Sequence, residues 1–111
     1  MHDPAPAAVI TETRGPVAII TINRPEVRNA VDGRTADGLR EAFEEFESAP
    51  DLRVAVLTGA EGTFCAGADL KAISTGAGNR IEADMSLPGP MGPTRMTLSK
   101  PTIAAVEGHA V

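Results

Sequence analysis

Apolar residues recur along the chain with two different spacings, and these divide it into strands and helices. Runs rich in β-branched residues fill positions 8–13 and 17–22, and the "RGP" between them favours a β-hairpin. The second run is apolar at nearly every position, as in a strand buried on both faces. Similar short runs at 54–58 and 102–106 predict two more strands.

Between the second and third strands the spacing becomes that of a helix. Leu39, Ala42, Phe43 and Phe46 fall at i, i+3, i+4 and i+7, with glutamates filling most of the other positions. This pattern predicts one amphipathic helix over residues 34–48. Strands alternating with helices predict the α/β fold class.

Two aspartates are placed to cap helices, because a carboxylate before the first turn can accept hydrogen bonds from its free N–H groups. Asp32 precedes the amphipathic helix, and Asp69 precedes a shorter one predicted over 70–73. A further helix is predicted at 94–99. Residues 74–93 contain four Gly and three Pro with few apolar anchors, so we expect a variable, mobile loop there.

Composition narrows the class of function. The chain has the length of one domain, with 42% hydrophobic and 23% charged residues, which is ordinary for a globular protein. A net charge of −5 without clustered Lys or Arg argues against a nucleic-acid partner. A single cysteine, Cys65, excludes an intrachain disulfide and fits the cytoplasm. No apolar run approaches the ~20 residues of a membrane span.

Familiar catalytic motifs are missing from the sequence. No Gly-x-Ser-x-Gly elbow occurs, which leaves little support for a serine hydrolase. One cysteine and two histidines in unrelated positions make a metal site an unfavoured interpretation, and no metal is predicted. No glycine motif fits a phosphate-binding loop.

The segment "TFCAGADLKAI", residues 63–73, is the main candidate for chemistry. Ala66, Gly67 and Ala68 are small enough to let a carbonyl oxygen approach the backbone N–H groups at a helix start, which would form half an oxyanion hole. The same residues could instead only allow the helix to pack tightly on the strand, and spacing alone leaves both interpretations open. Asp69 lies beside this site, but its position favours capping over a role as general base.

Four segments carry a family resemblance. "TINRPEVRNAV", "VLTGAEGTFCAGADLKAI", the variable loop and "SKPTIAAVEGHAV" follow in this order, and together the chain resembles the crotonase superfamily, also called the enoyl-CoA hydratase/isomerase family. The resemblance implies a crotonase-like ββα spiral. It also implies that residues 1–111 are the N-terminal part of one acyl-CoA-binding domain, since the sequence stops inside an apolar stretch.

The resemblance also implies a site. Family members bind acyl-CoA thioesters and hold the thioester oxygen with two backbone N–H groups, of which the first corresponds to Ala68. Its CoA-contacting positions correspond to Val27, Arg28, Ala30, Ala66, Gly67, Asp69 and Leu70. The Ala66 carbonyl would face the adenine, and Arg28 could meet a CoA phosphate or be an ordinary solvated cation. No cofactor is implied beyond the coenzyme A of the substrate.

Two functions remain open at this level. The first is an enzyme of the hydratase/isomerase type that stabilises a CoA-thioester enolate, with the second oxyanion donor and the acid/base groups expected after Val111. The family implies a homotrimer or a hexamer built from two trimers. The second is a truncated, non-catalytic module that binds acyl-CoA or assembles with other subunits.

Overall fold

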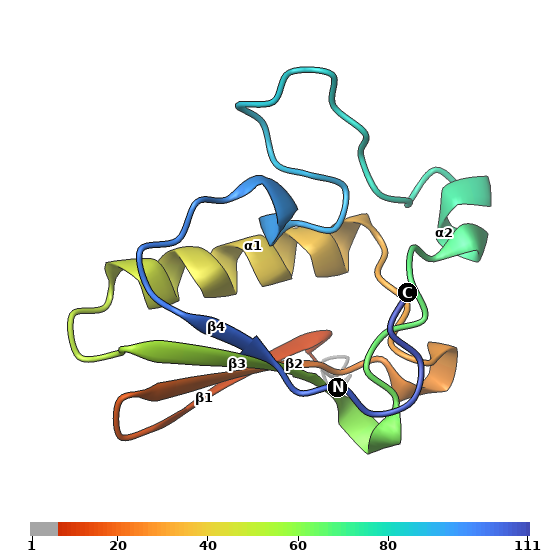
Figure 1. Cartoon of the computed structure of the whole chain (residues 1–111). Helices are drawn as coiled ribbons and strands as arrows, with labels where there is room; N and C mark the ends of the chain where they lie inside the picture. The colour runs from red at the N-terminus through yellow and green to blue at the C-terminus, as the bar shows by residue number, and fades with distance from the viewer. Residues whose placement is uncertain (1–6) are drawn as a thin grey trace, which may run out of the picture.

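The computed structural model describes residues 7–111, which form one four-stranded sheet with a long helix on one of its faces (Figure 1). Its strands are β1 (Val9–Arg14), β2 (Val17–Ile22), β3 (Val54–Gly59) and β4 (Thr102–Ala104), in that spatial order. β1 and β2 are antiparallel, and β2, β3 and β4 are parallel. The hairpin and the α/β class are confirmed, although β1 lies one residue later than predicted and β4 is shorter.

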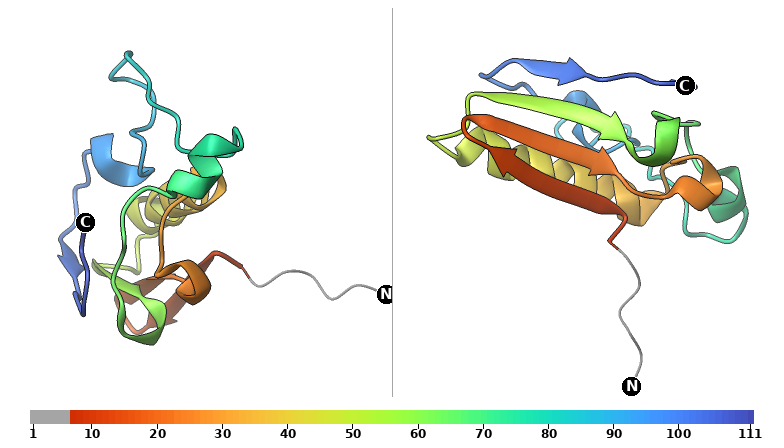
Figure 2. Two further views of the ribbon diagram at one scale, coloured as in Figure 1. Left: turned by 90° about the vertical axis from the view of Figure 1, so that its right-hand side faces the viewer. Right: turned by 90° about the horizontal axis from the view of Figure 1, so that it is seen from below.

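The amphipathic helix α1 (Gly33–Ser48) crosses one face of this sheet (Figures 1 and 2). It begins one residue before the predicted start, and Asp32 caps it as expected. The Asp32 carboxylate accepts from the Thr35 backbone N–H at 2.8 Å and from the Thr35 hydroxyl at 2.6 Å. The buried side of the helix carries Thr35, Ala36, Leu39, Ala42, Phe43 and Phe46.

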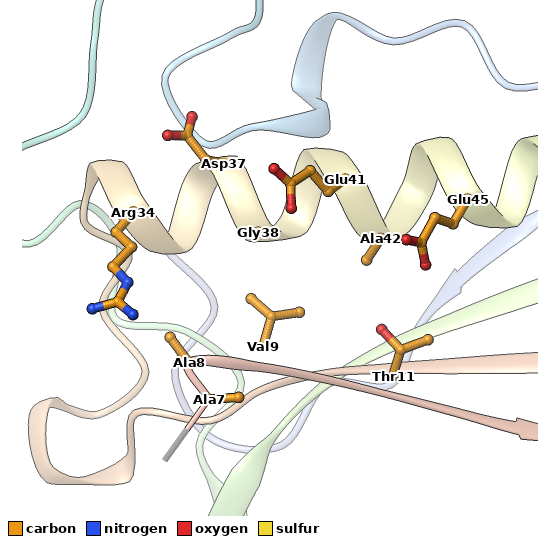
Figure 3. Close-up of a pocket in the computed structure, with 10 residues that line it drawn as sticks. All are labelled: Ala7, Ala8, Val9, Thr11, Arg34, Asp37, Gly38, Glu41, Ala42 and Glu45. Atoms are coloured by element: carbon orange, nitrogen blue, oxygen red, sulfur yellow. The ribbon is translucent and has the colours of Figure 1, made fainter. Parts of the chain in front are cut away.

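A glycine allows the helix to approach the edge of the sheet. In Figure 3 the Val9 side chain points toward Gly38 on the helix, and a Cβ atom at this glycine would lie 3.1 Å from Val9 Cγ2. Gly costs about 1 kcal/mol relative to Ala inside a helix. Close packing of α1 on β1 therefore accounts for its presence.

The expectation that residues 17–22 are buried on both faces is wrong for the residues described. Ala18, Ile20 and Ile22 are buried beneath α1, whereas Val17 and Ile19 on the opposite face are only half-buried. The reason is that α1 covers one face, while no described helix covers the other.

The remaining elements are short. Helix α2 (Leu70–Ser74) matches its prediction within one residue, and three 3₁₀ turns are η1 (Pro25–Val27), η2 (Ala60–Gly62) and η3 (Pro93–Arg95).

The helix predicted over 94–99 is wrong, since only η3 forms there. Met96 is extended with φ −74° and ψ 141°, and Ser99 donates its N–H and hydroxyl to the Glu47 carboxylate at about 3 Å. These tertiary bonds replace the local helix.

The 74–93 loop contains no regular element after α2 until η3. Polar bonds nevertheless hold it: Asn79 Nδ2 donates to the Pro90 carbonyl at 2.7 Å, and Arg95 donates to the Glu82 carbonyl at 2.7 Å. Its mobility stays a prediction.

Candidate functional site

Three stretches of backbone that are distant in sequence run side by side at one end of the sheet. Residues 28–31, 64–69 and 107–111 form what we call the three-segment ladder, and Figure 1 shows the end of the chain beside the central segment. On its first side, Ala66 N donates to the Arg28 carbonyl at 3.1 Å. The ladder thus joins both segments that the resemblance assigns to CoA binding.

The other side of the central segment binds the last stretch of the chain. Phe64 N donates to the Glu107 carbonyl at 2.7 Å, Cys65 N donates to the His109 carbonyl at 2.9 Å, and Val111 N donates to the Cys65 carbonyl at 3.0 Å. Cys65 is buried and its thiol is free. Its place inside the ladder supports a structural role.

The Ala68 N–H has a direction fixed by its neighbours. Val31 N donates to the Gly67 carbonyl at 2.8 Å, and Asp69 N donates to the Val31 carbonyl at 2.9 Å, so Val31 brackets Ala68. A trans peptide directs its C=O and N–H to opposite sides. Since the Gly67 carbonyl faces Val31, the N–H of the same peptide must point away from residues 28–31.

Nothing in residues 7–111 accepts a hydrogen bond from this N–H, and Ala68 is exposed. Buried backbone N–H groups are nearly always paired. The Ala68 N–H can remain unpaired because Ala68 lies at the surface. Gly67 adopts φ +100°, a conformation that residues with a side chain rarely adopt. The turn that presents Ala68 therefore depends on glycine.

Asp69 is a helix cap, as the sequence indicated. Its Oδ1 accepts from Ala72 N at 3.0 Å and its Oδ2 accepts from Arg24 Nη1 at 3.0 Å, while only 9% of the residue is exposed. The Ala72 hydrogen bond and the Arg24 charge hold the pKa of the Asp69 carboxyl below its usual value. An ionised, fully engaged carboxylate of this kind is a poor general base.

Arg24 is a site residue that the sequence did not single out. Its Nη1 donates to the Ala30 carbonyl at 2.6 Å and to Asp69 at 3.0 Å, and its Nη2 lies 3.6 Å from Asp32 Oδ2. One guanidinium group thus contacts the caps of both α-helices. In the sequence, the only neighbouring feature that marks Arg24 is Pro25, which follows it directly.

Asn29 joins two loops. The side chain is fully buried, and its Nδ2 donates to the carbonyls of Ala60 at 2.9 Å and Thr63 at 2.6 Å. Its Oδ1 accepts from Arg24 N at 2.8 Å. The residue has φ 58°, in the left-handed region where Asn is tolerated.

The other predicted CoA-contacting residues differ in exposure. Val27, Arg28 and Leu70 are exposed. Ala30 is buried and its carbonyl is bound to Arg24, so it shapes the segment without offering a polar group. Ala66 is half-buried.

A pocket of about 420 Å³ lies elsewhere, between β1 and α1 (Figure 3). It is lined by Ala7, Ala8, Val9, Thr11, Arg34, Asp37, Gly38, Glu41, Ala42 and Glu45. None of the predicted CoA-contacting residues contributes to this lining. Among residues 7–111 no three or more His, Cys, Asp or Glu side chains are grouped to hold a metal ion. The same range contains no helix with the length and apolar character of a membrane span.

Comparison of the sequence with known proteins identifies its family. The sequence model of the enoyl-CoA hydratase/isomerase family matches residues 12–111. The chain is 40% identical over 109 residues to enoyl-CoA hydratase EchA19 of Mycobacterium tuberculosis, covering 92% of this chain and 40% of that protein. It is 45% identical over 100 residues to a carnitinyl-CoA dehydratase of Proteus mirabilis, covering 88% and 37%.

Solved structures give the same result. The crystal structure of a carnitinyl-CoA hydratase from Mycobacterium avium matches with a TM-score of 0.83 and 46% identity, over 94% of this chain and 40% of that one. An enoyl-CoA hydratase from Mycobacterium tuberculosis matches with a TM-score of 0.81 and 42% identity, over 91% and 38%. The chain belongs to the enoyl-CoA hydratase/isomerase family and has the crotonase fold of its first part. It spans about two fifths of the length of these relatives.

Proposed function

We propose that the full-length protein acts on an acyl-CoA thioester by hydratase/isomerase-type chemistry, with the Ala68 N–H as one donor to the thioester oxygen. The observation that carries the proposal is this N–H itself. Ala68 is exposed, and its N–H has no acceptor within residues 7–111 and points away from the segment that brackets it. The names of the relatives, enoyl-CoA hydratase and carnitinyl-CoA dehydratase, support a CoA derivative as the substrate.

The chemistry needs a donor with a fixed direction. Negative charge grows on the thioester oxygen as an enolate forms, and a donor held in place beforehand stabilises that charge without reorganising. The bonds from Val31 to both neighbours of Ala68 provide this rigidity.

The predicted CoA contacts fit the same place. The ladder brings Ala66 beside Arg28, because Ala66 N donates to the Arg28 carbonyl, and both Val27 and Arg28 are exposed. Arg28 would meet a phosphate of CoA, Gly67 and Asp69 would line the pocket, and the substrate's own coenzyme A would be the only cofactor.

The proposal extends to assembly and location. A homotrimer, or a hexamer of two trimers, is the assembly that the family resemblance implies, and we include it in the proposal. A reducing compartment such as the cytoplasm is supported by the free, buried Cys65.

Replacing Ala68 by Pro tests the proposal, since Pro has no N–H. In the full-length protein we expect kcat/KM for an enoyl-CoA to fall by about 10²–10³-fold, the usual effect of losing one oxyanion donor. Ala68→Gly keeps the N–H and serves as the matched control, with activity expected close to that of the wild type. Equal activity of folded Ala68→Pro and Ala68→Gly proteins would contradict the assignment.

A binding module without turnover is the second candidate. The observation that favours it is the use of Asp69, the acid beside Ala68, as a cap bound to Arg24. Calorimetry with a CoA thioester and turnover assays on the same sample separate the two functions. Binding without turnover supports the module, and binding with turnover supports the enzyme.

A further inference from the structure

The segment that carries the Ala68 N–H is held at its following residue by one side chain. Asp69 takes part in three hydrogen bonds. Its N–H donates to the Val31 carbonyl, its Oδ1 accepts from Ala72 N, and its Oδ2 accepts from Arg24 Nη1. The first two join Asp69 to backbone groups, the Val31 carbonyl and the Ala72 N–H, and the third joins it to a side chain. The third comes from 45 residues earlier in the chain.

Arg24 also binds the 28–31 segment of the ladder. The same Nη1 that binds Asp69 donates to the Ala30 carbonyl at 2.6 Å, and Ala30 directly precedes Val31, which brackets Ala68. The backbone of Arg24 is itself fixed, because its N–H donates to the Asn29 side chain and its carbonyl accepts from Asn29 N at 2.8 Å. The guanidinium group therefore connects both sides of the Val31–Ala68 pairing.

Resting on the function proposed above, we propose that Arg24 is a positioning residue for the oxyanion site: it fixes the peptide that carries the Ala68 N–H by holding Asp69 against the Ala30 carbonyl. It touches no reacting atom in this role. Its effect passes through Asp69 and the Val31 bracket.

Charge adds a second contribution. The Asp32 and Asp69 carboxylates both contact Arg24, at 3.6 Å and 3.0 Å, and the side chains of this group are at most 20% exposed. Without the guanidinium cation, two ionised carboxylates would remain close to a site where negative charge develops. Their repulsion would oppose an enolate oxygen at Ala68.

The test compares kinetics of three variants of the full-length protein with an enoyl-CoA substrate. Arg24→Met removes the cation, and Asp69→Asn removes its charged partner while keeping a residue that caps helices well. Arg40→Met is the matched control, because Arg40 also pairs with a carboxylate, Glu44, in α1, but makes no hydrogen bond or ion pair with Arg24, Asp32 or Asp69. Thermal unfolding of each variant establishes the temperature range in which it is folded.

We expect Arg24→Met to lower kcat by roughly 10- to 100-fold, as small misplacements of a reacting geometry do. Asp69→Asn breaks the same contact but also removes one carboxylate charge, so it should lower kcat by a smaller factor. KM should change far less, because the exposed CoA-contacting residues remain in place. Arg40→Met should keep both constants. Should Arg24→Met fail to fold, Asp69→Asn carries the same test.

The outcomes separate this inference from the proposed function. An active wild type whose folded Arg24→Met or Asp69→Asn variant matches the Arg40→Met control overturns the role of Arg24 and leaves the proposed function intact. A rise in KM with unchanged kcat in the Arg24→Met or Asp69→Asn variant would also overturn the role of Arg24 and leave the proposed function intact. A wild type that turns over no enoyl-CoA overturns the proposed function, and the inference with it.

Discussion

The α1–sheet interface and the three-segment ladder are built from different interactions. The interface consists of apolar side chains, with Ile20, Leu39 and Phe46 almost fully buried. The ladder consists of backbone hydrogen bonds among three segments, reinforced by the polar side chains of Arg24 and Asn29. Burial of apolar area is non-directional, whereas hydrogen bonds fix direction.

This difference matches the role that we propose for each region. A packed interface supplies stability and tolerates small changes of angle. A site that offers one N–H to a ligand needs that group in a fixed orientation. The hydrogen bonds of Val31 to the residues on both sides of Ala68 fix the orientation of the Ala68 N–H. Substitutions in the interface should therefore change stability first, and substitutions in the ladder should change function first.

Phe46→Ala should give the largest loss of stability. Phe46 is 1% exposed, and the Lys100 ammonium lies 4.9 Å from its ring centroid. Removing a buried Phe side chain costs about 3–5 kcal/mol through lost burial and the cavity left behind. Urea unfolding measures this free energy. Below the unfolding range, CoA-thioester affinity per folded molecule should stay near the wild-type value, and a loss of affinity equal to that of ladder variants would break the comparison.

Asn29→Ala should cost less stability than Phe46→Ala, about 2–3 kcal/mol. The Ala60 and Thr63 carbonyls would lose their donor, and Ala tolerates the left-handed backbone of this position poorly. Asn29→Gly removes the same hydrogen bonds but accepts φ 58° readily, so it should be the milder change. Urea unfolding of the two variants separates the bond loss from the backbone strain. Both should lose turnover beyond what their stability explains, and unchanged turnover would refute the functional role of the ladder.

Acid should weaken the ladder by a smaller amount. The Ala72 hydrogen bond and the Arg24 charge lower the pKa of Asp69 from its ordinary value of 3.8. For Asp32, burial acts to raise the pKa, but the Thr35 hydrogen bonds and Arg24 together lower it.

A depressed folded-state pKa means that the stabilisation is present above the unfolded-state value and is lost as the pH falls through the folded-state value. The difference in unfolding free energy between the wild type and Asp69→Asn should thus be constant above about pH 5 and shrink below about pH 3.8. Urea unfolding at a series of pH values measures it. A difference that grows as the pH falls would contradict the sign.

Local spacing made much of the fold predictable. The period of Leu39, Phe43 and Phe46 and the positions of Asp32 and Asp69 before helices depend on neighbouring residues only. The helix predicted at 94–99 failed because a tertiary partner, Glu47, takes the Ser99 N–H.

The site was predictable only in part. Ala68 and its neighbours came from a family resemblance, and cap geometry correctly favoured Asp69 as a cap. The role of Arg24 could not be read from spacing, because its contact with Asp69 spans 45 residues and that of Asn29 with Thr63 spans 34. Such contacts depend on how the strands bring loops together.

The most direct test of the central claim is the amide spectrum of the isotopically labelled full-length protein during titration with a CoA thioester. If the Ala68 N–H binds the thioester oxygen, its proton resonance should move strongly downfield. The Ala66 and Asp69 amides, which already donate to Arg28 and Val31, serve as internal references and should move little. Saturable binding that leaves the Ala68 resonance unmoved would contradict the account.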